Sequence, residues 1–116
     1  MSQSPGNQLL KGHLHTLVLH LLADKGRMYG YEITREVKER TAGQVQLTEG
    51  ALYPVLHKLE SQGVLLTETE LADGRARKYY RLNEAGQELA QSTQQQLMQE
   101  LQSVLLIFNP PQMRWT

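Results

Sequence analysis

The stretch LTEGALYPVLHKLESQGVLLTETELADGRARKYYRL, residues 47–82, decides the fold because its hydrophobic period changes from that of a helix to that of strands. Its apolar side chains first recur every three or four residues, at Leu52, Val55, Leu56 and Leu59. Thr48 precedes them as a good N-cap, and Gly63 follows them as a stop signal. The spacing therefore predicts a helix over 48–62, whose first turn is distorted by Pro54.

The second half of this stretch predicts a β-hairpin whose returning arm is basic. Residues 64–70 favour a strand, Asp73-Gly74 is a typical turn between two strands, and residues 78–82 form the second strand. Four cations without an intervening acid lie in this arm: Arg75, Arg77, Lys78 and Arg81. A glycine turn that projects cations is suited to the phosphates or the minor groove of DNA.

Helical patterns flank the stretch on both sides. Apolar spacing predicts a first helix over 9–23, i,i+4 charge pairs indicate a second over 31–41, and a glutamine-rich helix is expected over 84–108. Three helices followed by a hairpin are the order of a winged helix-turn-helix. We therefore predict a mostly α fold with a small β-hairpin, in which one long C-terminal dimerisation helix follows a winged helix-turn-helix.

Four segments make up the predicted organisation, in a chain long enough for one domain. Small polar residues with Pro and Gly predict a flexible N-terminal arm over 1–8. The winged helix-turn-helix DNA-binding domain is expected over 9–82, the C-terminal dimerisation helix over 83–109 and a tail over 110–116.

The composition excludes several classes of protein. The chain has 116 residues, no cysteine, and 12 Lys+Arg balanced by 12 Asp+Glu. Without cysteine, disulfides, thiolate zinc sites and thiol nucleophiles are excluded. No apolar run reaches the length that spans a bilayer, and the N-terminus carries no signal pattern. We therefore expect a cytoplasmic protein with no membrane partner.

Histidines offer the remaining route to a metal site or an enzyme. The chain has four of them: His13, His15, His20 and His57. His13 and His20 share a helical face, but no carboxylate joins them at the spacing of metal ligands. We therefore expect no enzyme, no metal and no cofactor.

The outer face of the predicted helix over 48–62 carries candidate DNA contacts. Once the leucines and the valine turn inward, the residues left outside are Gly50, Tyr53, Pro54 and His57, with Lys58 at the flank. An aromatic hydroxyl, an imidazole and an ammonium group can contact phosphates or base edges. The alternative left open is that Tyr53 closes the core and that His57 is ordinary surface.

Three segments resemble the PadR-like family of bacterial transcriptional regulators, which is named for the control of phenolic-acid decarboxylase. They are LLKGHLHTLVLHLLADKGRMYGYEITREV over 9–37, LTEGALYPVLHKLESQGVL over 47–65 and DGRARKYYRLNEAG over 73–86. The resemblance implies a dimeric repressor of the family's short subclass, and it leaves a small-molecule effector of unknown identity open. Together with the outer helix face, it implies DNA contacts at Thr48, Gly50, Ala51, Tyr53, Pro54, His57, Lys58, Gly74, Arg75, Arg77 and Lys78.

The C-terminal helix carries more apolar side chains than a small winged domain can cover. Leu97, Leu101, Val104 and Phe108 follow the seam spacing of paired helices. Left in water, such a stripe forms a larger apolar patch than monomers usually tolerate. We therefore predict a homodimer with an interface at Leu9, Leu10, Leu14, Leu97, Leu101, Val104, Leu105 and Phe108.

These features predict a DNA-binding transcriptional regulator, and the family resemblance implies that it acts as a repressor. A homodimer is expected to bind a near-palindromic operator in double-stranded DNA through the helix at 48–62 and the wing at 72–81. The alternative is a winged-helix protein–protein interaction module without specific DNA binding, which the zero net charge favours. The cationic arm of the hairpin favours the regulator, because an interaction module has no need of it.

Overall fold

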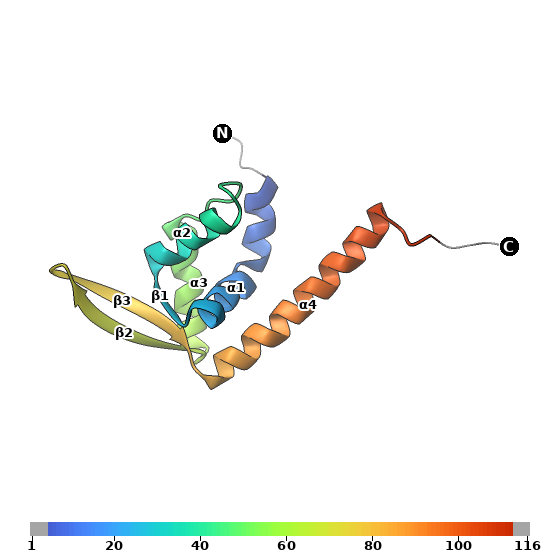
Figure 1. Ribbon diagram of the computed structural model, residues 1–116. Coiled ribbons are helices and arrows are strands. Elements are labelled where there is room, and N and C mark those ends of the chain that lie inside the picture. The colour runs from blue at the N-terminus through green and yellow to red at the C-terminus, as the bar shows by residue number, and fades with distance from the viewer. Residues whose placement is uncertain (1–4, 113–116) are drawn as a thin grey trace.

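The computed structural model describes residues 5–112, with side chains from residue 11 onward. Its elements follow one another in this order (Figure 1): α1 (Pro5–Lys25), β1 (Arg27–Tyr29), α2 (Gly30–Arg40), α3 (Glu49–Ser61), β2 (Leu65–Ala72), β3 (Arg75–Leu82) and α4 (Glu84–Phe108). The predicted winged helix-turn-helix with one long C-terminal helix is confirmed. Between residues 5 and 112, no helix combines the length and the apolar character needed to cross a bilayer.

The core of the winged domain lies between the first three helices and the inner face of the sheet. Its most deeply buried side chains are Val18, Leu19, Leu22, Ile33, Leu52, Leu56 and Leu59. All four inward positions predicted for α3 are buried. Burying a side chain of this size contributes about 1.5–3 kcal/mol, so this shared core fixes α3 against α1 and α2.

A third strand, β1, joins the predicted hairpin and was not expected from the sequence. The sheet order is β1-β3-β2, with both pairings antiparallel. Met28 of β1 lies opposite Tyr80 of β3, and both side chains are buried. A strand of three residues is too short to display an alternating pattern. The strand ties the connection between α1 and α2 to the base of the wing.

The N-terminal helix begins earlier than predicted. α1 starts at Pro5, inside the segment 1–8 that we expected to be a flexible arm. Proline is favoured at the first helical position because its φ is already helical and its missing N–H is not needed there. Residues 1–4 lie outside the described part of the chain. Within α1, His13 has non-helical backbone angles (φ −126°, ψ 17°) and marks a kink.

The helix α4 has the predicted bounds and is seated on the winged domain by its first turn. The Asn83 side chain accepts a hydrogen bond from the Gly86 N–H (2.8 Å) and donates one to the Gly63 carbonyl (2.6 Å). Gly86 is buried, and a Cβ there would overlap the carbonyl oxygen of Val64. The absence of a side chain at Gly86 therefore permits close approach of the two backbones.

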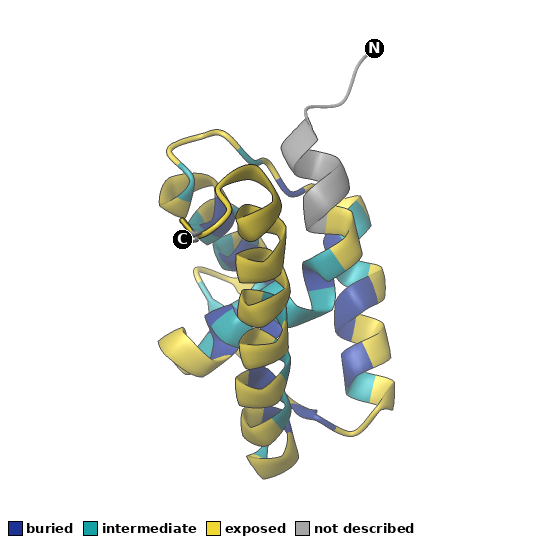
Figure 2. Cartoon of the chain, turned by 90° about the vertical axis from the view of Figure 1, so that its right-hand side faces the viewer, coloured by how far each residue is buried: buried dark blue, intermediate teal, exposed yellow. Residues whose placement is uncertain are grey.

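The two halves of α4 have different surroundings. In the first half, Ala90 is buried, and Gln94 Oε1 lies 2.9 Å from His20 Nδ1 of α1. From Met98 to the end of the helix every residue is exposed. Figure 2 shows this exposed surface running along the far part of the helix, which extends away from the body in Figure 1. The second half of α4 therefore has no partner within the described residues.

Candidate nucleic-acid interface

The start of α3 presents a polar, exposed edge. The Thr48 side chain accepts a hydrogen bond from the Ala51 N–H (3.2 Å), which satisfies one of the free donors of the first turn. Of the residues predicted to contact DNA, those exposed on this helix and its cap are Thr48, Gly50, Pro54, His57 and Lys58. Ala51 is half-buried and packs against the core. The exposed set forms one continuous outer face of α3.

Tyr53 has a more structural position than the outward one we predicted. Its ring is half-buried against Gly30 at the start of α2, where an added Cβ would lie 2.8 Å from the Tyr53 Cζ. Burial raises the pKa of the Tyr53 hydroxyl, and the neighbouring Glu49 raises it further. The close packing agrees with the alternative in which Tyr53 closes the core. Its hydroxyl stays protonated and remains a neutral donor and acceptor.

The wing is a tight hairpin with its cations near the tip. Asp73 and Gly74 both have positive φ (53° and 75°), as the two central residues of a type I′ turn require. Arg75 and Lys78 are exposed, whereas Arg77 is half-buried with its guanidinium carbon 4.7 Å from the centre of the Tyr29 ring. The hairpin and α4 diverge from the base of the sheet and end on opposite sides of the molecule (Figure 1).

The ammonium group of Lys78 has two neighbours within its own chain, Glu60 and Tyr80, that compete with an external anion. Its Nζ lies 3.5 Å from Glu60 Oε1 on α3 and 5.4 Å from the centre of the Tyr80 ring. An exposed ion pair of this kind is weak and exchanges readily with solvent or another anion. Lys78 therefore links the wing to α3 in the free protein and remains able to meet a phosphate.

A groove of about 520 Å³ separates α3 from the wing. Its lining includes three of the predicted DNA contacts from the wing, Arg75, Arg77 and Lys78, and one from α3, Tyr53. The structure also brings in Tyr29, Gly30 and Tyr31, which we did not predict as site residues. The Tyr-Gly-Tyr sequence over 29–31 could have pointed to these residues. Its glycine is needed because a side chain at Gly30 would occupy the space that the Tyr53 ring fills.

The residues predicted for a dimer interface have different surroundings in the structure. Leu14 is only 4% exposed and belongs to the core of its own chain. The prediction that it lies in the dimer interface is therefore wrong. It faces inward because the kinked α1 packs that side against the other helices. Val104, Leu105 and Phe108 are exposed. The side chains of Leu9 and Leu10 lie outside the described residues.

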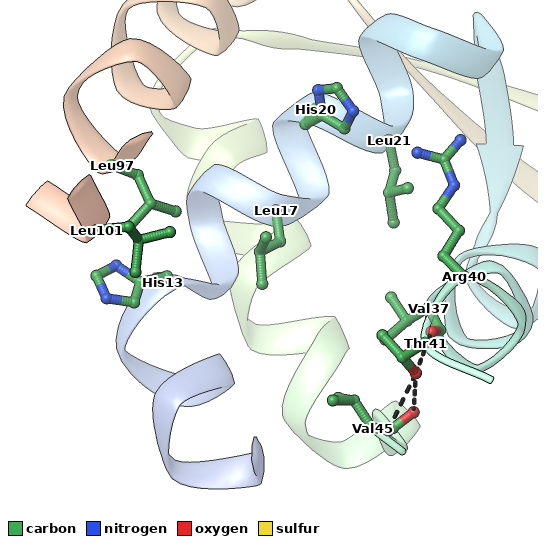
Figure 3. Close-up of a pocket in the computed structure, with 10 residues that line it drawn as sticks. All are labelled: His13, Leu17, His20, Leu21, Val37, Arg40, Thr41, Val45, Leu97 and Leu101. Atoms are coloured by element: carbon green, nitrogen blue, oxygen red, sulfur yellow. Dashed lines mark hydrogen bonds between the residues drawn. The ribbon is translucent and has the colours of Figure 1, made fainter. Parts of the chain in front are cut away.

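Leu97 and Leu101 line a cavity of about 310 Å³ between α1, α2 and α4 (Figure 3). The other residues around it are His13, Leu17, His20, Leu21, Val37, Arg40, Thr41 and Val45. The Arg40 guanidinium is occupied by ion pairs with Asp24 and Glu36. The cavity is therefore an apolar recess beside the start of the unpartnered half of α4.

The histidines are not assembled into a metal site. Across residues 5–112, no three His, Asp or Glu side chains gather where one ion could be held. His15 is half-buried, and burial lowers its pKa, with Lys58 lowering it further. His57 lies exposed on α3.

Known proteins are similar to this chain in sequence and in fold. The profile of the transcriptional regulator PadR-like family matches residues 18–92. The chain is 38% identical over 81 residues to "Uncharacterized protein X" of Lysinibacillus sphaericus, covering 69% of this chain and 73% of that protein. It is 39% identical over 69 residues to "Transcriptional regulator Rv3488" of Mycobacterium tuberculosis, covering 60% of this chain and 61% of that protein.

A solved structure matches a larger share of the chain than the family profile does. The PadR family transcriptional regulator from Eggerthella lenta superposes with a TM-score of 0.74 at 27% identity, covering 89% of this chain and 88% of that one. The family consists of transcriptional regulators rather than enzymes. With its winged fold, its cationic hairpin and these matches, the chain belongs to the PadR-like family of transcriptional regulators.

Proposed function

We propose that this chain is a repressor that binds a near-palindromic operator as a homodimer. The observation that carries the proposal is the groove in which the wing cations and α3 face each other. Its walls offer cations for phosphates, and the exposed face of α3 beside it offers His57 for base edges. In a winged helix-turn-helix, the second helix of the pair enters the major groove, and here that helix is α3.

The dimer is supported by the unpartnered half of α4. Its exposed apolar side chains are Met98, Leu101, Val104, Leu105, Leu106, Ile107 and Phe108. Leu97, Leu101, Val104 and Phe108 lie along one line of this helix, and a second copy related by a two-fold axis would bury them. The cavity beside Leu97 and Leu101 becomes part of the same interface. Two-fold symmetry would also present two α3 helices to DNA half-sites about 34–36 Å apart.

Binding to DNA upstream of its own gene tests the proposed function. We expect the purified protein to protect a near-palindromic segment from cleavage and to bind that fragment at least a thousandfold more tightly than random DNA, about the lower limit for specific binders. Repression requires that the protected segment overlap a promoter and that transcription from it fall when the protein is added. Equal affinity for all fragments would favour the interaction module instead.

Removing two wing cations should weaken DNA binding and its dependence on salt. In the Arg75→Ala, Arg77→Ala double variant, we expect the slope of log affinity against log salt to fall by about 0.9 for each phosphate that the wing no longer neutralises. Arg81→Ala is the matched control, because it removes a cation from the base of the same strand. A folded double variant with unchanged affinity and salt slope would exclude the wing from the interface.

His57 should contribute to sequence discrimination. We expect His57→Ala to lose about 1–3 kcal/mol on the operator and little on random DNA, because a side chain that reads a base acts only in the specific complex. Lys58→Ala serves as the comparison, since removing a cation that binds a phosphate weakens binding to both kinds of DNA. The measurement is the ratio of operator affinity to random-DNA affinity. An unchanged ratio in His57→Ala would show that His57 reads no base.

A further inference from the structure

The outer face of the sheet is built by the register of its three strands. Arg27 lies opposite Arg81, and Tyr29 lies opposite Tyr79. Glu68 lies opposite Tyr79 from the other side, and Glu70 lies opposite Arg77. Because side chains alternate along each strand, all these residues share one face. The opposite face carries the buried Met28 and Tyr80 side chains, so the helices pack there and leave the outer face uncovered.

Arg27 connects all three strands across this face. Its Nη1 and Nη2 donate to the two carboxylate oxygens of Glu70 (2.7 and 2.9 Å), and Nη1 also donates to Glu68 Oε1 (3.1 Å). Its guanidinium carbon lies 4.1 Å from the centre of the Tyr79 ring on the strand between them. A two-pronged arginine–carboxylate pair fixes direction as well as distance. The side chain therefore clamps β1 to β2 over β3.

This clamp reaches towards the tip of the wing. Arg27 lies in the row of Leu66, and Glu70 is four residues further along β2. Within residues 5–112, β1 ends at Tyr29, so the outer part of the hairpin has only two strands. A two-stranded hairpin alone is marginally stable in water. The orientation of its tip therefore depends on side chains that connect it to β1.

Two carboxylates are unexpected on a surface that meets DNA. Glu68 and Glu70 place negative charge on the wing, which by itself opposes the approach of phosphates. Hydrogen bonds from Arg27 lower the pKa of Glu70 below its usual value, so the pair stays charged at neutral pH. A structural role for Glu70 accounts for its presence beside the cations.

We propose that Arg27 and Glu70 form a brace that sets the angle of the wing, and that Arg27 is a positioning residue for DNA binding rather than a DNA contact. The inference rests on the proposed function, in which the wing meets DNA. Without the brace, the tip cations sample many directions, and each binding event must select the productive one. Affinity then falls although the cations themselves are still present.

The Glu70→Thr variant separates bracing from charge. Removing a carboxylate makes the wing more positive, so charge alone predicts tighter operator binding, whereas the brace predicts binding about fivefold weaker. Threonine keeps a strand-favouring side chain at this position. Arg27→Met should lose a similar factor, and the matched control is Arg81→Met, which removes the same charge from the same row of the sheet. Arg81→Met should lose less than Arg27→Met.

A charge swap tests the pair directly. Arg27→Glu combined with Glu70→Arg keeps the net charge and can remake the ion pair, so it should recover most of the operator affinity that either single change loses. Operator binding by Glu70→Thr as tight as that of the unchanged protein would overturn the brace. The brace would also be overturned if the charge-swap variant recovers no operator affinity although its helices exchange amide hydrogens at the normal rate, which shows that it is folded.

Hydrogen exchange distinguishes failure of the brace from failure of the proposed function. Loss of the brace should accelerate exchange of amides over 69–78 while α1 and α3 stay protected, and this measurement needs no DNA. If the unchanged protein binds no operator, the proposed function fails. The exchange rates of Arg27→Met against Arg81→Met still decide whether Arg27 holds the hairpin, and equal rates would overturn the brace.

Discussion

A variant carrying Val104→Glu and Phe108→Glu is expected to lose about a hundredfold or more in operator affinity while its winged domain stays folded. Both side chains are exposed in the single chain, 48% and 75% respectively, so carboxylates there meet water and leave the core intact. In the proposed dimer, the two changes would bury four unpaired negative charges in one apolar seam. Each such charge costs several kcal/mol, and about 1.4 kcal/mol is a factor of ten.

Sedimentation velocity at micromolar concentration and operator binding together measure this effect. The matched control is Gln102→Glu with Leu106→Glu, which places the same two charges four residues apart on the opposite side of α4 from the seam, at 100° per residue. The control should remain a dimer and bind the operator. A seam variant that still sediments as a dimer, or that binds the operator fully as a monomer, would contradict the proposed interface.

Gly86→Ala is expected to destabilise the fold by about 1–2 kcal/mol. A Cβ at this position would overlap the Val64 carbonyl oxygen and lie 3.1 Å from the Leu82 Cβ. The obstacle is backbone, so relief requires that α4 move off the sheet, and overpacking of this kind costs about 1–3 kcal/mol. This loss exceeds the ~1 kcal/mol that alanine gains over glycine inside a helix.

Gly50→Ala is the matched control, because Gly50 also lies in the first turn of a helix and nothing stands within 4 Å of its missing Cβ. We expect Gly50→Ala to be neutral or to stabilise the fold by up to about 1 kcal/mol. Urea unfolding followed by circular dichroism measures both. A Gly86→Ala protein as stable as the unchanged protein would show that α4 is not seated on Val64.

Local sequence signals were sufficient for the helices and for the hairpin. Thr48 and Asn83 are side-chain caps, and their residue type alone marks where α3 and α4 begin. The Asp-Gly turn sets the hairpin register, because its two residues accept positive φ. These signals act within a few residues of one another, so a sequence displays them directly.

Features that depend on distant pairing were not predictable from the sequence. Arg27 and Glu70 are 43 positions apart, and only the three-stranded register brings them together. The prediction that Tyr53 points outward was wrong in part. Its ring packs against Gly30 of α2, and the spacing of residues within α3 does not display a contact with another helix. Leu14 has the same apolar character as the seam residues, and only the packing of α1 shows that it belongs to the core.

The first turn of α4 is held against Val64 and Gly63, so the rest of this helix can pivot about the base of the sheet. A helix of 25 residues is about 37 Å long, so tilting it by about five degrees moves its far end by ~3 Å. In the proposed dimer, that displacement would pass to the whole partner subunit. Substitutions at Gly86, Val64 or Asn83 would therefore change which operator spacing is preferred, without altering any group that touches DNA.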